Sequence, residues 1–304
     1  MADKQDKSQT KPTSLQATIA GGFAGLLCIA PLDVVKINMQ LQTNRLEGLK
    51  WAKRGIVHQT KGIYKEFGAR GFWRGNASAQ WLYLFYGGSQ FFAYDQIKRA
   101  LAKTDLSSES KHFISGAVAG TFATVTTYPF DILRTRFAAQ SKDRVYTSVL
   151  DGFQKMAKAE GFRGLYTGLA PSIVSILPQA GLMFVGYEAL APVFKELNLP
   201  FGAGDFLAGA VASGAAKTAV FPLDLIRKRL QVQGPARSKL AYGAIPEYKR
   251  NMFAAGRAIL QNEGPRGLYR GLVIGVLKAA PTASLYFWFN ARALEILVQN
   301  EIFA

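Results

Sequence analysis

The chain contains very few of the residues that form disulfide bonds, metal sites or catalytic centres. It has one cysteine, Cys28, and two widely separated histidines, His58 and His112, among 304 residues. One cysteine excludes an intrachain disulfide and a cysteine-based zinc site, and histidines without partner ligands nearby are expected to be ordinary loop or helix-end residues. The sequence also lacks a nucleophile–base constellation and a phosphate-binding P-loop. We therefore expect no metal, no cofactor and no enzymatic activity.

Acidic residues are scarce as well. The chain carries 20 Asp and Glu against 37 Lys and Arg, a formal net charge of +17. Such a charge is typical of proteins that bind nucleic acid, an anionic membrane or an acidic substrate. However, 49% of the residues are hydrophobic and only 19% are charged, which disfavours a nucleic-acid partner. Residues 1–14 lack both the apolar core of a secretory signal and the arginine-rich character of a transit peptide, so targeting information is expected inside the chain.

Two short motifs recur three times in the same order. The first is PLDVVK at 31–36, PFDILR at 129–134 and PLDLIR at 222–227; the second is GFWRG at 71–75, GLYTG at 164–168 and GLYRG at 267–271. Such a threefold recurrence predicts a triplicated supersecondary unit. We expect one domain over residues 1–304, made of repeats at about 15–102, 110–197 and 204–299.

Each repeat predicts two long apolar helices joined by a basic segment that contains a short amphipathic helix, such as 56–66 or 251–262. The long helices are expected at 15–40, 76–101, 112–139, 169–197, 204–231 and 272–294. At 1.5 Å per residue each can cross a bilayer. Polar residues within them, such as Gln80, Gln179 and Lys217, are tolerated where they face a water-filled cavity. The predicted fold class is an all-α membrane protein with six transmembrane helices in three pseudo-symmetric repeats. The long loops at 41–75, 140–168 and 232–271 are strongly basic, which favours the inner face of the membrane.

The motifs resemble the signature of the mitochondrial carrier family, in which Pro-x-acidic-x-x-basic is followed by an aromatic-basic-glycine element. The resemblance covers about residues 15–299. It implies a monomeric, multi-pass transporter of the mitochondrial inner membrane that moves a small anionic metabolite by alternating access, as in antiport. It also implies that the basic loops and the short helices lie in the matrix.

A matrix-side gate is predicted from the proline motifs. The acid and the base of each motif are three residues apart, so they share a helix face and can pair with neighbouring helices around a ring. Asp131 is expected to pair with Lys36 or Arg227, and each partly exposed pair should contribute only about 0–1 kcal/mol. The predicted gate residues, including the glutamine braces implied by the resemblance, are Asp33, Lys36, Asp131, Arg134, Asp224, Arg227, Gln40 and Gln231. Ala138 replaces the brace in the second repeat.

The resemblance implies two further features. A second ionic ring on the cytoplasmic side is incomplete here, with Asp95, Lys98 and Glu188 as its members, so the matrix gate is expected to be the stronger. Cardiolipin phosphates are expected at the starts of the second long helix of each repeat, the helices expected at 76–101, 169–197 and 272–294, where free backbone N–H groups bind anions. The implied cardiolipin-binding residues are Arg74, Gly75, Gly168, Arg270 and Gly271.

Substrate contacts are implied at mid-membrane positions seven or eight residues beyond the motif glycines. Those positions are Leu82, Ser175 with Ile176, and Lys278. Lys278 and Lys217 are intramembrane lysines, which are costly unless functional, and they indicate an anionic substrate. Tyr83, Tyr86 and Gln90 follow at helical spacing, either to stack on a ring of the substrate or to form a helix-packing stripe.

Longer stretches resemble the mitochondrial thiamine pyrophosphate carriers, namely residues 86–91, 128–140 and 168–172. A diphosphate suits the lysines, and a pyrimidine and a thiazolium suit aromatic faces. The alternative is a nucleotide or coenzyme A carrier of the same family, because these substrates also need cations and an aromatic platform.

Overall fold

A computed structural model of the chain describes residues 12–42, 55–102, 104, 107–140, 144–196, 203–237, 240 and 246–278. Within these ranges the chain is built from α-helices and short 3₁₀ turns, and an isolated antiparallel bridge joins Gln140 to Leu240. The elements are α1 (Pro12–Leu41), α2 (Ile56–Phe67), η2 (Ala69–Trp73), α3 (Asn76–Leu101), α4 (Ser108–Ala138), α5 (Val149–Gly164), α6 (Leu169–Glu196), α7 (Ala203–Gln231), α8 (Met252–Glu263), η5 (Pro265–Tyr269) and α9 (Leu272–Leu277). The all-α class predicted from the sequence is confirmed for the described residues.

The long helices begin and end close to the predicted positions, and the predicted helix at 272–294 is described as α9 up to Leu277. Pro31, Pro129 and Pro222 lie inside α1, α4 and α7. Each removes a backbone hydrogen bond near the end of its helix that carries the ionic motif. Two of the described segments, Gly22–Leu41 and Leu169–Lys195, are long and apolar enough to cross a membrane by length and composition.

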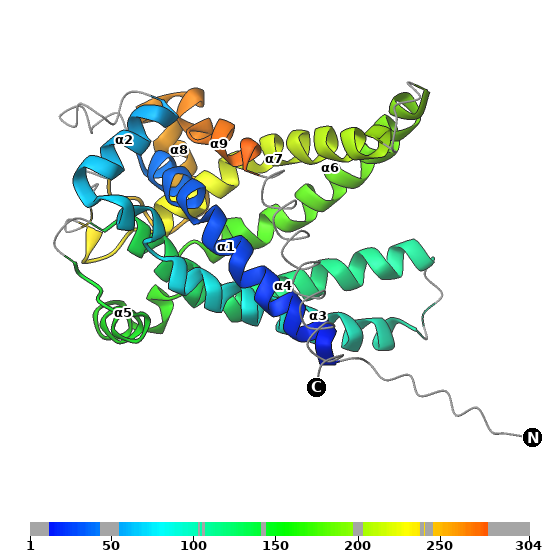
Figure 1. The fold of residues 1–304 in the computed structure, drawn as a ribbon, viewed down its shortest axis with the longest axis horizontal. Coiled ribbons are helices and arrows are strands. Elements are labelled where there is room, and N and C mark those ends of the chain that lie inside the picture. The colour runs from blue at the N-terminus through cyan, green and yellow to red at the C-terminus, as the bar shows by residue number, and fades with distance from the viewer. Residues whose placement is uncertain are drawn as a thin grey trace, which may run out of the picture.

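The long helices are arranged as adjacent pairs that diverge from a common end. Helix α3 lies beside α4, and α6 lies beside α7, along most of their lengths. The two pairs splay apart toward the right of Figure 1, while the short helices α2, α5 and α8 gather at the opposite end. The helices that carry the proline motifs, α1, α4 and α7, meet at that end, which we call the short-helix end.

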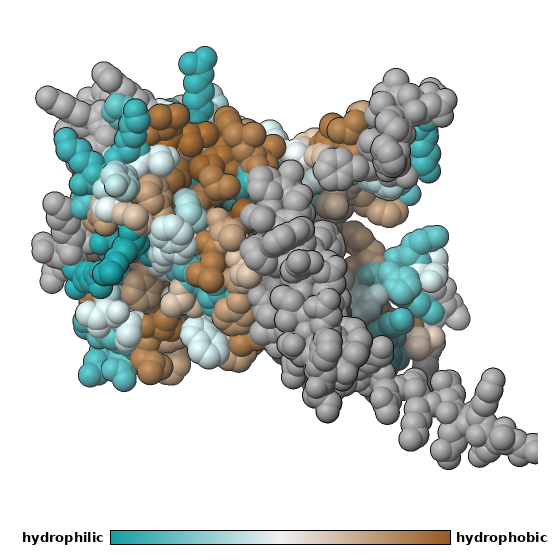
Figure 2. All heavy atoms as spheres, viewed as in Figure 1, coloured by the Kyte–Doolittle hydropathy of each residue, from teal (hydrophilic) through white to brown (hydrophobic). Residues whose placement is uncertain are grey.

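The surface in Figure 2 carries hydrophilic side chains at the short-helix end and at the tips of the splayed helices, with hydrophobic surface between them. Large apolar side chains are exposed on the long helices, as at Phe92, Phe122, Phe184 and Val211. Exposed apolar area of this extent is typical of a surface that contacts lipid.

The core lies at the short-helix end. Val35 on α1 and Leu225 on α7 are buried with Ile63 of α2 and Ile259 of α8 in one cluster. Glycine is required where the start of α3 reaches α4: Gly75 has φ +81°, and a Cβ there would lie 2.6 Å from the Arg134 carbonyl oxygen. The close approach brings the start of α3 against the ionic motif of α4.

Buried ion pairs tie the short helices to the long ones in two of the three repeats. Arg136 of α4 pairs with Glu160 of α5, and Arg229 of α7 pairs with Glu263 of α8, with all four side chains at most 2% exposed. The first repeat has Asn38 at the position of the arginine and Phe67 at the position of the glutamate. This second position is equivalent in all three repeats, because the next residue is always a positive-φ glycine. Uncharged residues therefore stand in place of the ion pair in this repeat, and Asn38 donates to the Val34 carbonyl instead.

Candidate functional site

A ring of ion pairs joins α1, α4 and α7 at the short-helix end. Asp33 of α1 pairs with Arg134 of α4. Asp131 of α4 pairs with Arg227 of α7 at 2.7 Å, and Asp224 of α7 pairs with Lys36 of α1 at 2.8 Å. Each carboxylate thus contacts the base of the next helix around the ring. Of the two partners considered for Asp131, the geometry selects Arg227.

Each carboxylate of the ring has a second cation. Lys278 contacts Asp33, Lys228 lies 3.1 Å from Asp131, and Lys217 lies 3.4 Å from Asp224. All three additional lysines belong to the third repeat. Six cations therefore face three carboxylates, and this part of the molecule carries an excess of positive charge that attracts anions.

The two glutamine braces lie against the ring. Gln231 donates a hydrogen bond to Asp131, and Gln40 donates one of 3.3 Å to Asp224. Ala138 offers no such donor to Asp33, where Lys278 supplies the additional contact. The ring is closed by neutral donors at two carboxylates and by a second cation at all three.

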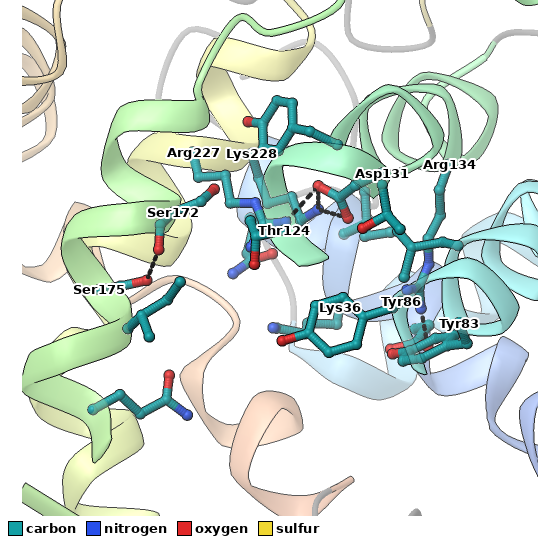
Figure 3. A pocket seen from close by; sticks show the side chains of 18 of the residues that line it. Lys36, Tyr83, Tyr86, Thr124, Asp131, Arg134, Ser172, Ser175, Arg227 and Lys228 are labelled. Atoms are coloured by element: carbon teal, nitrogen blue, oxygen red, sulfur yellow. Dashed lines mark hydrogen bonds and ion pairs between the residues drawn. The ribbon is translucent and has the colours of Figure 1, made fainter. Parts of the chain in front are cut away.

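A cavity of about 300 Å³ opens above this ring. The ring members that line it are Asp33, Lys36, Asp131, Arg134, Arg227, Gln40 and Lys228. Figure 3 shows Tyr83 and Tyr86 of α3 on one wall and Ser172 and Ser175 of α6 on another. The arrangement combines cations, aromatic faces and hydroxyls, which suits a small anion with an aromatic part.

Most of the predicted substrate contacts lie together in this cavity. Its lining includes Leu82, Tyr83, Tyr86, Ser175, Ile176 and Lys278. Gln90 and Lys217 are not among the lining residues, and Lys217 instead contacts Asp224. Lys217 is therefore part of the ion-pair cluster in this structure.

Sequence reasoning missed several lining residues. Thr124, Thr127 and Tyr128 of α4 and Ser172 of α6 contribute to the cavity, as does Lys228. A comparison of the repeats could have singled out Lys228, because the equivalent positions hold Ile37 and Thr135. A lysine at one of three otherwise uncharged positions inside a helix is a signal for function.

The residues predicted for the cytoplasmic gate do not form a ring in this structure. Asp95 pairs with Arg99 on its own helix at 2.7 Å, and both side chains are more than half exposed. Lys98 and Glu188 are also exposed. The cavity is thus closed by ion pairs at the short-helix end, whereas within the described residues no ion pair joins Asp95 or Lys98 of α3 to Glu188 of α6.

A second pocket, of about 260 Å³, lies where α3 and α5 begin. Arg70, Arg74 and Arg144 line it together with Gly75 and Ser148. Arg74 donates 2.7 Å to the Gln140 carbonyl, and burial lowers its pKa, with Arg144 adding repulsion. Gly168 and Gly271, at the starts of α6 and α9, have positive φ like Gly75, and Arg270 donates to the Gln42 carbonyl. Three arginines beside two helix N-termini suit an anion.

Metal chemistry has no candidate site within the described residues, since no cluster of three or more His, Cys, Asp or Glu occurs there. Cys28 is a free, exposed thiol. The groups around the main cavity can bind and orient an anion.

The family model for mitochondrial carrier proteins matches the chain three times, over residues 10–105, 107–198 and 200–301. The chain belongs to the mitochondrial carrier family, and it is a multi-pass protein of the mitochondrial inner membrane. This confirms the family resemblance stated from the sequence motifs.

Within that family the chain is similar to fungal proteins named mitochondrial thiamine pyrophosphate carrier 1. It is 45% identical over 299 residues to the one from Neosartorya fischeri, covering 94% of each chain. It is 46% identical over 295 residues to the one from Ajellomyces capsulatus, covering 93% of this chain and 91% of that one. For Aspergillus oryzae the identity is 44% over 304 residues, covering 95% of each. The predicted resemblance to thiamine pyrophosphate carriers is confirmed.

Proposed function

We propose that this protein carries thiamine pyrophosphate across the mitochondrial inner membrane by alternating access, in exchange for another anion, and catalyses no covalent reaction. The observation that carries the proposal is the cavity, which brings the aromatic side chains Tyr83 and Tyr86 together with a cluster of cations. A diphosphate suits the cations, and the pyrimidine and thiazolium rings suit the aromatic faces. The names of the similar fungal proteins support this substrate.

The short-helix end faces the matrix in this proposal, because the basic loops adjoin it. The ring formed by Asp33, Asp131 and Asp224 with their partners is then the matrix gate, and the structure corresponds to the state open toward the cytoplasmic side. Glu188 of α6 would approach Asp95 and Lys98 of α3 only in the opposite state. Six transmembrane helices in three repeats, acting as a monomer, provide the moving parts.

Cardiolipin is the proposed partner at the matrix surface. The pocket lined by Arg70, Arg74 and Arg144 supports a phosphate at the start of α3, and Gly168 and Arg270 with Gly271 mark the corresponding places on α6 and α9. Backbone N–H groups at helix starts and nearby guanidinium groups both favour phosphate. Nucleic acid is not a partner in this proposal, because the basic loops face an anionic membrane surface.

Thiamine pyrophosphate is expected to stabilise the purified protein and to be taken up by liposomes that contain it. A ligand that binds only the folded state adds about 2.7 kcal/mol at a concentration 100 times its dissociation constant. The measurement is the melting temperature in detergent, followed by uptake of the radiolabelled compound, with unphosphorylated thiamine as the control. A shift with a nucleotide or coenzyme A, and none with thiamine pyrophosphate, would favour the alternative carrier class.

Lys278→Ala is expected to reduce uptake of thiamine pyrophosphate at least about tenfold, since hydrogen bonds to charged groups are strong in a confined site. Asp33 keeps Arg134 in this variant, so the protein should still fold. Lys155→Ala provides a matched control, because Lys155 forms an exposed pair with Asp151 on the same helix. An apparent KM unchanged by Lys278→Ala would remove Lys278 from the substrate site.

A further inference from the structure

The two cations at each ring carboxylate differ in how deeply they are buried. One set is deep: the side chains of Arg134, Lys36 and Lys228 are 11%, 10% and 9% exposed. The other set is shallower: those of Lys278, Lys217 and Arg227 are 20%, 26% and 23% exposed. Each carboxylate therefore has one deep cation and one shallow cation. At Asp131 the shallow cation is the arginine of the proline motif itself.

Lys228 is the more firmly held of the two cations at Asp131. Its ammonium group lies 3.1 and 3.2 Å from the two carboxylate oxygens of Asp131. It also donates 3.0 Å hydrogen bonds to the Thr135 hydroxyl and to the Gln231 side-chain oxygen. These acceptors come from both α4 and α7. Lys228 itself lies on α7, so its contacts with Asp131 and Thr135 join α7 to α4 without help from Arg227.

Arg227 makes fewer hydrogen bonds in the ring than Lys228 does. It makes one contact with Asp131, at 2.7 Å, and within the described part of the chain its buried Nε has no hydrogen-bond partner. Its guanidinium group also lies over the ring of Tyr128, 5.6 Å from the ring centroid, and it lines the cavity. A guanidinium with an unused donor beside a cavity is suited to bind phosphate in a forked geometry.

The hydroxyls of the nearby walls donate to the backbone. Thr124 donates to the Gly120 carbonyl at 2.7 Å, Ser172 to the Gly168 carbonyl at 3.2 Å, and Ser175 to the Ser172 carbonyl at 2.7 Å. Each hydroxyl has one proton to donate. The protons of these three hydroxyls are therefore already used, and an anion beside them must be bound by other groups, among which the cations carry the complementary charge.

We infer that Arg227 is a substrate-binding residue that contacts the diphosphate group, and that Lys228 keeps α4 and α7 joined at Asp131 while Arg227 turns to the substrate. The inference rests on the proposed function and extends it, because it adds a second cation to Lys278 in the substrate site. This second cation, Arg227, binds the terminal phosphate. A substrate with a diphosphate would then be preferred over the corresponding monophosphate.

The test compares Arg227→Gln, Arg227→Lys and Lys228→Ile in the full-length protein. Isoleucine is the residue at the equivalent position of the first repeat. The readouts are the melting temperature without ligand and the apparent KM for uptake of thiamine pyrophosphate and thiamine monophosphate. Inorganic diphosphate serves as a further probe in the melting experiment.

Arg227→Gln is expected to melt near the wild-type temperature without ligand, to raise the KM for the diphosphate about tenfold, and to raise that for the monophosphate less. Arg227→Lys should recover part of the loss because it keeps the charge. Lys228→Ile should lower the melting temperature without ligand, since only Arg227 and the neutral Gln231 then contact Asp131 among the described residues.

Each of the following results would overturn the inference. If Arg227→Gln leaves the ratio of the KM values for thiamine pyrophosphate and thiamine monophosphate unchanged, Arg227 does not bind the terminal phosphate. A ligand-free melting temperature that falls in Arg227→Gln as far as in Lys228→Ile, or an Arg227→Gln protein that does not fold, shows that Lys228 cannot hold the ring. If neither thiamine pyrophosphate nor inorganic diphosphate shifts the melting temperature of the wild type, both the proposed function and this inference are rejected. If the wild type responds to them and Arg227→Gln responds equally, this inference alone is rejected.

Discussion

Charge reversal of Asp131 to arginine should abolish uptake and lower the stability of the protein by about 3–5 kcal/mol, the usual cost of breaking a buried ion pair. The expectation of partly exposed gate pairs is wrong for Asp131, which is 5% exposed and contacts Arg227, Lys228 and Gln231. A third positive charge would replace the anion that holds these groups together. The measurements are the melting temperature in detergent and uptake into liposomes.

The second-site reversal tests the order of the ring. Combining Asp131→Arg with Arg227→Asp should restore much of the melting temperature, because it rebuilds an ion pair between α4 and α7. Uptake should recover less, since Arg227 also contacts the substrate in our inference. Combining Asp131→Arg with Lys36→Asp is the matched control, because Lys36 pairs with Asp224. Equal rescue by both combinations would be incompatible with the observed pairing.

Glu263→Gln should destabilise the protein by a similar amount, about 3–5 kcal/mol. The glutamate is 2% exposed, and its Oε2 lies 2.9 Å from a guanidinium nitrogen of Arg229, which is fully buried. Arg229 also donates to the carbonyls of Gln40 and Gln42 at the end of α1. Removing the carboxylate charge leaves a buried cation uncompensated where α1, α7 and α8 meet.

Glu247→Gln is the matched control for this substitution. Glu247 pairs with Arg237 at 3.4 Å and is 82% exposed, so its loss should cost about 0–1 kcal/mol. A melting temperature that falls equally in both variants would contradict the assigned role of Glu263. The double variant Arg229→Asn with Glu263→Phe should recover part of the loss, because it reproduces the neutral pair of Asn38 and Phe67 in the first repeat.

The fold was largely predictable because the sequence features that define it are local and occur in every repeat. Apolar length, the internal prolines and the helix-starting glycines each act within a few residues, and they occur in every repeat. They placed α3 and α6 within a few residues of their bounds. The family followed from the recurring motifs, and the resemblance to it implied Leu82, Ser175 and Lys278 as substrate contacts, which lie around one cavity.

The sequence by itself determined which residues could form the ring, and the tertiary structure decided how they are paired. Helical spacing showed that Asp131 and Arg134 share a face, but it left Lys36 and Arg227 equally available to Asp131. The direction of pairing depends on how α1, α4 and α7 are rotated against one another, which no single repeat encodes. The same holds for Lys228 and Lys278, whose contacts with Asp131 and Asp33 arise only when helices of different repeats pack together, whereas Lys217 meets Asp224 on its own helix. Side-chain charge is a property of the residue, whereas its partner and its depth are properties of the assembled helices.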